Sequence, residues 1–162
     1  MKRSLLIVVA LLLSSCTLHV DRRVYYVAED TPIEAMKTSE ELAEYVQAFE
    51  ERTGEYGMHA PVYLAYIEDP TVVGRCLIHV SDSRITKNIE ISIQWYDKHA
   101  EDTWLVRWVV FHELGHCSLG QDHRDEYLTS GEPASIMNSM LPDDGAAYEQ
   151  GHQYYEYELL GY

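Results

Sequence analysis

A short stretch around residue 112 holds the residue types best suited to chemistry. His112, Glu113 and His116 have the spacing HExxH. Two histidines four residues apart lie on one face of a helix, so both imidazoles can reach one metal ion. Glu113 is rotated by about 100° from His112 around the helix axis, so it can take a proton without ligating the metal. The pattern predicts a single zinc ion with a bound water that Glu113 activates.

The helix that carries this motif is expected to be buried. Asp102 offers an N-cap at its start. A helix that is apolar over much of its circumference packs in a core, and buried histidine and glutamate side chains then need partners. The apolar positions are Trp104, Leu105, Trp108, Val109, Phe111, Leu114 and Leu119.

Three residues downstream of the motif extend the pattern. Gly120 is suited to end the helix, because glycine enters a left-handed turn without a Cβ penalty. His123 follows three residues after Gly120, and Met137 follows 14 residues after His123. These residues are therefore candidates for a helix-ending turn, a third ligand and a marker of the fold.

The combination of HExxH, a glycine turn, a third histidine and a later methionine resembles the metzincin clan of zinc endopeptidases. The resemblance covers about residues 75–140. It implies zinc ligation by His112, His116 and His123, with Met137 in a Met-turn beneath the metal. The clan has two residues between the second histidine and the glycine, whereas this chain has three. The run HELGHC with a late third histidine also resembles small bacterial metallopeptidase-like lipoproteins.

Asp122 competes with His123 as the third ligand. A strict count from His116 puts Asp122 at the clan's ligand position, and carboxylates do bind zinc. His123 keeps the clan's spacing from Gly120 and is preferred for that reason.

The tyrosine-rich segment 148–157 is expected to pack as a C-terminal helix. The alternative, by resemblance to some members of the clan, is that Tyr154 or Tyr155 donates a hydrogen bond to an oxyanion.

The N-terminus resembles a bacterial lipoprotein signal. Lys2 and Arg3 precede an apolar run that is too short to span a bilayer. Small residues then precede Cys16, as in a lipobox. The expected organisation is a signal peptide over 1–15, lipid on Cys16, a tether over 16–35 and one domain over 36–162. The alternatives are an ordinary secretory signal and an N-terminal anchor helix.

This organisation predicts a protein of the bacterial cell envelope that is bound to the membrane by its lipid. Thr17 rather than aspartate after the cysteine favours the outer membrane, by resemblance to lipoprotein sorting. If Cys16 carries lipid, then Cys76 and Cys117 remain. They could form a disulfide in an oxidising compartment, or remain two buried thiols. A third reading makes Cys76 a zinc-blocking thiolate.

The composition limits the kinds of partner. The chain has 162 residues and a formal net charge of -15. Its length suits a single domain with a core, and its acidity argues against nucleic acid, which needs a basic face. The expected partners are a peptide or protein substrate and the membrane lipid, with the protein as a monomer.

The predicted fold class is α+β. A helix over 38–52 begins at what resembles a capping box, Thr38 to Glu41. Strands are expected over 61–67, 76–80 and 89–95, and the last alternates apolar and polar residues. By resemblance the fold is zincin-like: a small mixed sheet packs on the first helix and on the buried HExxH helix. The strand over 89–95, or a neighbour, is a candidate edge for binding an extended peptide.

The leading functional hypothesis is zinc-dependent hydrolysis of peptide bonds. One alternative is a non-catalytic, metal-stabilised binding module, or pseudopeptidase. Another is hydrolysis of amide bonds in the peptides of peptidoglycan. Glu113 favours the hydrolases, because a module without catalysis has no need of it.

Overall fold

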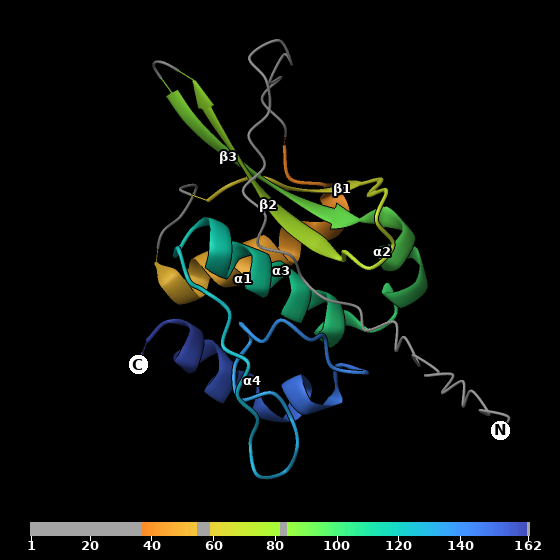
Figure 1. Ribbon diagram of the computed structural model, residues 1–162, viewed down its shortest axis with the longest axis vertical. Coiled ribbons are helices and arrows are strands. Elements are labelled where there is room, and N and C mark those ends of the chain that lie inside the picture. The colour runs from red at the N-terminus through yellow and green to blue at the C-terminus, as the bar shows by residue number, and fades with distance from the viewer. Residues whose placement is uncertain (1–36, 55–58, 82–83, 162) are drawn as a thin grey trace, which may run out of the picture.

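The computed structural model describes residues 37–54, 59–81 and 84–161. The predicted signal peptide, the lipidation site Cys16 and the tether 16–35 lie outside these residues. The described part is a small α+β unit with a mixed sheet and four α-helices (Figure 1). Its elements are η1 (Glu40–Leu42), α1 (Ala43–Thr53), β1 (Val62–Ala65), β2 (Gly74–Ser81), β3 (Arg84–Ser92), α2 (Ile93–His99), α3 (Thr103–Cys117) and α4 (Ala146–Leu159). None of the described helices is long and apolar enough to cross a bilayer.

The sheet has the order β1-β3-β2, so β3 is its central strand. β1 is parallel to β3 and β2 is antiparallel to it. The outer edge of β1 is covered by residues that precede the first helix. The Ser39 amide donates to the Val62 carbonyl at 2.9 Å, and the Thr38 hydroxyl accepts from the Val62 amide at 3.3 Å. Among the described residues, β2 is therefore the edge without such a cover.

The expected strand over 89–95 is wrong beyond Ser92, and it is not an edge. The Ser92 hydroxyl accepts a hydrogen bond from the Trp95 amide at 3.3 Å and caps α2. Trp95 is buried while Ile93 is exposed, so the apolar alternation does not continue on one face. The strand ends at Ser92, three residues earlier than expected, because Ser92 caps α2 within the alternating run.

The first helix begins later than expected. Residues 40–42 form a 3₁₀ turn, and the α-helix starts at Ala43 and ends at Thr53. The capping box from Thr38 to Glu41 is wrong, because the Thr38 hydroxyl accepts from the Val62 amide. The residue before the turn is Ser39, which makes no side-chain cap. Its hydroxyl accepts from the Leu64 amide at 3.1 Å instead. The local sequence favoured a helix cap, but the hydroxyl accepts a hydrogen bond from the adjacent strand instead.

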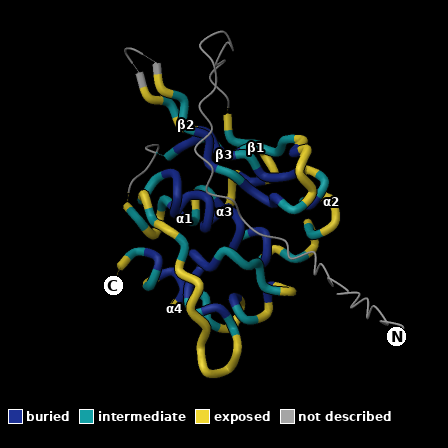
Figure 2. The backbone as a smooth tube through the Cα atoms, in the orientation of Figure 1, coloured by how far each residue is buried: buried dark blue, intermediate teal, exposed yellow. Residues whose placement is uncertain are grey.

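α3 lies at the centre of the molecule. It packs on β2 and β3, and α1, α2 and α4 pack on it. Every residue from Trp108 to Cys117 is buried, as the dark tube through the middle of Figure 2 shows. The prediction of a buried HExxH helix is confirmed.

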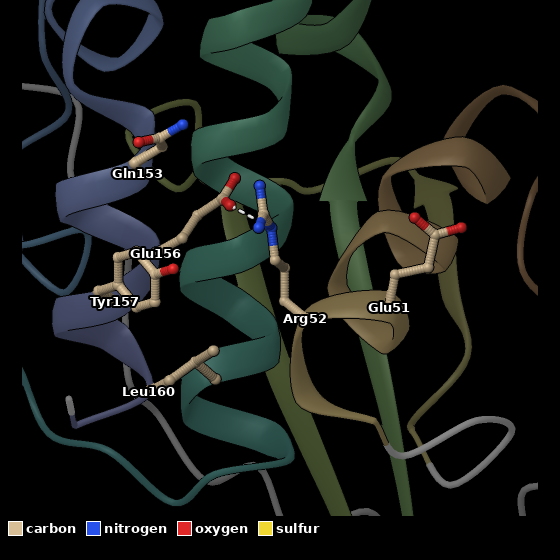
Figure 3. A pocket seen from close by; sticks show the side chains of 6 residues that line it. All are labelled: Glu51, Arg52, Gln153, Glu156, Tyr157 and Leu160. Carbon is tan, nitrogen blue, oxygen red and sulfur yellow. Dashed lines mark ion pairs between the residues drawn. The ribbon is translucent and has the colours of Figure 1, made fainter.

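A buried carboxylate joins three of the helices. Glu156 on α4 is 3% exposed and forms ion pairs with Arg52 on α1 at 2.7 Å and Arg107 on α3 at 2.6 Å. The Tyr148 hydroxyl donates to the same carboxylate at 3.0 Å. Figure 3 shows Arg52 reaching towards Glu156 beside a small pocket of about 200 Å³ between α1 and α4. The pocket contains none of the candidate zinc ligands.

Candidate metal site

Three histidines from two segments meet at one point. His112 and His116 come from α3, and His123 comes from the chain after it. Their ligand nitrogens all lie within 4.8 Å of one another, and His116 Nε2 is 3.0 Å from His123 Nε2. Tetrahedral zinc with bonds of about 2.0–2.1 Å places its ligand nitrogens roughly 3.3 Å apart. The three side chains are therefore close enough to bind one metal ion.

Backbone carbonyls orient two of the imidazoles. The Nδ1 atoms of His112 and His116 are each 2.7 Å from a carbonyl oxygen, of Ile136 and Gln121 respectively. A carbonyl only accepts, so Nδ1 carries the proton and Nε2 is left as a lone-pair donor. Metal-binding histidines in proteins use this arrangement to fix the ring and its tautomer.

His112 gives an independent test of whether a metal fits. Its side chain is fully buried, and no described residue forms a hydrogen bond with its Nε2 atom. Burial, followed by the charge of His116, lowers the pKa of His112 well below its usual 6.5, so the ring is neutral. A buried nitrogen lone pair is costly without a partner, and a metal ion would provide one. A donor set of three imidazole nitrogens fits a divalent transition metal.

The end of α3 explains how the late third histidine reaches the site. The helix ends at Cys117, and Gly120 follows in the left-handed conformation with φ of 67°. The Gln121 amide then donates back to the Gly115 carbonyl at 3.0 Å. The prediction of a glycine turn is confirmed. The extra residue before Gly120 is absorbed in this turn, and the chain still returns His123 to His116.

The segment that carries His123 is fixed to a second segment around Met137. The Arg124 amide donates to the Met137 carbonyl at 2.8 Å, and the Ser139 amide donates to Asp125 at 2.8 Å. Hydrogen bonds from Ser139 hold the pKa of Asp125 below its usual value. Arg124 and Asp125, the two residues after His123, are therefore both held by hydrogen bonds to the segment around Met137.

Met137 lies directly against the helix between the two helical histidines. A Cβ atom on Gly115 would lie 2.5 Å from the sulfur of Met137, and 3.1 Å from Leu159. Met137 itself is fully buried. The glycine of HELGH thus leaves room for the methionine. The motif spacing alone does not indicate this role, although a glycine inside a buried helix is costly and could have pointed to a close contact.

Glu113 faces β2 rather than open solvent. Its side chain is fully buried, and a Cβ on Gly74 would lie 2.7 Å from its Oε1 atom. Gly74 therefore leaves the space that the carboxyl group occupies. Glu113 does not belong to the group of three metal-binding candidates.

A disulfide joins Cys76 on β2 to Cys117 at the end of α3, with a Cα–Cα distance of 5.5 Å. Together with the contact between Gly74 and Glu113, it shows that α3 and β2 run side by side in the same direction. Four helical residues rise about 6 Å and two strand residues about 6.6 Å, so the two contacts agree in spacing. Lys87 Nζ also donates to the Cys117 carbonyl at 2.6 Å.

Asp122, Tyr154 and Tyr155 do not belong to the group of three metal-binding candidates. Asp122 is exposed and is not among the converging donors. The hydroxyls of Tyr154 and Tyr155 donate to the carbonyls of Ala134 and Pro133, both at 2.9 Å. These tyrosines hold α4 to the preceding loop, as expected for a packed C-terminal helix.

Comparisons with known proteins add no assignment. A scan against protein-family models, a search of curated proteins and a search of solved structures each found no match to this chain.

Proposed function

We propose that this protein is a zinc-dependent peptide hydrolase of zincin type, anchored in the bacterial cell envelope by lipid on Cys16. The observation that carries the proposal is the convergence of His112, His116 and His123 beside Glu113. The lipid anchor is supported by the lipobox-like sequence that ends at Cys16.

The place of β2 supports peptide as the substrate class. The Ser92 amide bonds to the Val73 carbonyl, so hydrogen-bonded pairs with β3 recur at every second residue from Val73. The backbone groups of Gly74, Cys76 and Ile78 therefore point away from β3. An extended peptide can add to such an edge by main-chain hydrogen bonds. This edge runs beside α3, which carries two of the three ligands.

Each residue of the site has a defined task in this proposal. His112, His116 and His123 would hold the zinc ion. When bound, zinc supplies Lewis acidity, which acidifies a water molecule and polarises a carbonyl group. Glu113 would accept the proton of the attacking water and pass it to the leaving amine. Met137 would close the site from below as an apolar floor.

The buried position of Glu113 favours one competing function. A general base must reach water, and this carboxyl group is fully covered and packed on Gly74. A non-catalytic module stabilised by metal needs no such access. The two functions share the metal site and differ in what Glu113 does.

An assay for hydrolysis of a peptide library by zinc-loaded full-length protein in detergent distinguishes the peptide hydrolase from the non-catalytic module. We expect Glu113→Ala to keep one zinc ion and to lose about 10²–10⁴-fold in hydrolysis rate. His123→Ala should lose zinc affinity and activity together. Zinc binding without cleavage of any peptide, and without dependence on Glu113, would instead identify the non-catalytic module.

A further inference from the structure

The last turn of α4 is connected to all three histidines through hydrogen bonds of the residues around them. Its residues Glu158 and Leu159 contact the segments on either side of the site. We infer that Glu158 is a positioning residue for the metal site, which braces the His123 segment against the Met137 segment. This inference rests on the metal-binding part of the proposed function.

The two oxygens of Glu158 serve different segments. Oε1 accepts from the guanidinium of Arg124, the residue next to His123. Oε2 accepts from the Ser135 hydroxyl at 2.7 Å. One carboxylate therefore ties the third ligand's segment to the segment that carries the Ile136 carbonyl.

The second segment reaches the first ligand. The Ser135 hydroxyl accepts from the Met137 amide at 3.0 Å and so shapes the turn that contains Ile136. The Ile136 carbonyl is the acceptor that orients the His112 ring. A shift of Ser135 would thus be transmitted to His112 through one residue.

Leu159 completes the connection to the remaining ligand. Its carbonyl accepts from the Gln121 side chain, and the Gln121 carbonyl orients the His116 ring. The Leu159 side chain also packs near Gly115. The end of α4 therefore fixes the surroundings of every candidate ligand.

Glu158 is placed to affect metal binding more than stability. Its side chain is 16% exposed and that of Arg124 is 48% exposed, so the ion pair adds little to the free energy of unfolding. Residues that orient metal ligands typically change metal affinity by about 10–100-fold. Because Glu158 acts one residue further from the metal, we expect the lower end of that range.

The test measures zinc affinity of the full-length protein by competition with a chromophoric chelator, and the d–d absorption of the cobalt form. We expect Glu158→Ala to weaken zinc binding by about tenfold and to alter the cobalt spectrum. Glu149→Ala changes an exposed glutamate on the same helix and should leave both unchanged. Arg124→Ala tests the same contact if Glu158→Ala does not fold, and should also weaken zinc binding.

The double variant of Glu158 and Arg124 distinguishes positioning from general loosening. Both substitutions remove the contact between Arg124 and Glu158, so their effects on zinc affinity should be less than additive. The inference would be overturned, with the proposed function left standing, if both single variants kept a zinc affinity within twofold of wild type and an unchanged cobalt spectrum. Failure of the wild type to bind zinc would overturn it together with the proposed function.

Discussion

Each helical histidine uses its two ring nitrogens for separate tasks. In His112 and His116, Nδ1 donates to a backbone carbonyl, which leaves Nε2 as a lone-pair donor. The HExxH spacing predicts that two imidazoles share a helix face. It does not predict the acceptors, because Ile136 and Gln121 reach the rings only through the fold. The third ligand, in contrast, could be predicted from its spacing along the sequence from Gly120.

Gly115 leaves the space that the sulfur of Met137 occupies, so a side chain at this position should cost stability. Gly115→Ala should destabilise the protein by about 1–3 kcal/mol, because the new Cβ would overlap the sulfur of Met137. Urea unfolding measures this change. Met137→Ala in the same chain should relieve the overlap, so the double variant should lose less stability than the sum of the two single variants. Simple additivity would show that the two side chains do not compete for space.

The alkaline stability of the protein depends in part on Tyr45. Burial, with the neighbouring charge of Glu44, raises the pKa of Tyr45 to about 12. In the unfolded chain tyrosine ionises near pH 10, so stability falls as the pH rises from about 10 to about 12. Below pH 10 Tyr45 is protonated in both the folded and the unfolded protein, so its contribution to the free energy of unfolding is fully present.

Tyr45→Phe removes this ionisation and isolates its effect from the other tyrosines. The free energies of unfolding of wild type and variant should differ by a constant amount below pH 10. Above pH 10 the wild type should lose stability relative to the variant. A difference that stays constant from pH 8 to pH 12 would be inconsistent with a raised pKa of Tyr45.

At the scale of elements, the sequence predicted the kinds of helix and strand better than their ends. The buried α3 followed from its apolar circumference, and its start at Asp102 from the cap, whose carboxylate accepts from the Leu105 amide at 3.0 Å. The errors came where a hydroxyl had two available partners. Ser92 ended a strand that looked continuous, and Ser39 bonded to β1 rather than to its own helix. Such choices depend on which element lies nearby in space.

The disulfide between β2 and α3 gives a prediction about how these elements are held. The two cysteines are 41 residues apart in sequence. Closing a loop of that length in the unfolded chain stabilises the folded state by about 3–4 kcal/mol in the chain-entropy model. Replacing both cysteines by alanine should lower the free energy of unfolding by this amount in urea. A loss under about 1 kcal/mol would show that packing alone fixes β2 on α3.

At the scale of the whole molecule, one helix organises both the core and the site. α3 contacts the sheet on one side and three helices on the others, so its histidines are held in a rigid frame. The sequence predicted the α+β class and a mixed sheet. It did not predict that β3 would be central and β2 the edge, because strand order depends on long-range pairing that no local pattern records. The ion-pair cluster around Glu156 could likewise not be predicted from the sequence, because its members come from three separate helices.

X-ray absorption of the zinc-loaded protein tests the three-histidine site, because it reports the ligands of the metal itself. The predicted result is one zinc ion per chain, with three imidazole nitrogens at about 2.0–2.1 Å. His123→Ala should lose one imidazole, and Asp122→Ala should retain all three. Loss of a ligand in Asp122→Ala but not in His123→Ala, or the absence of stoichiometric zinc in the wild type, would contradict the three-histidine site.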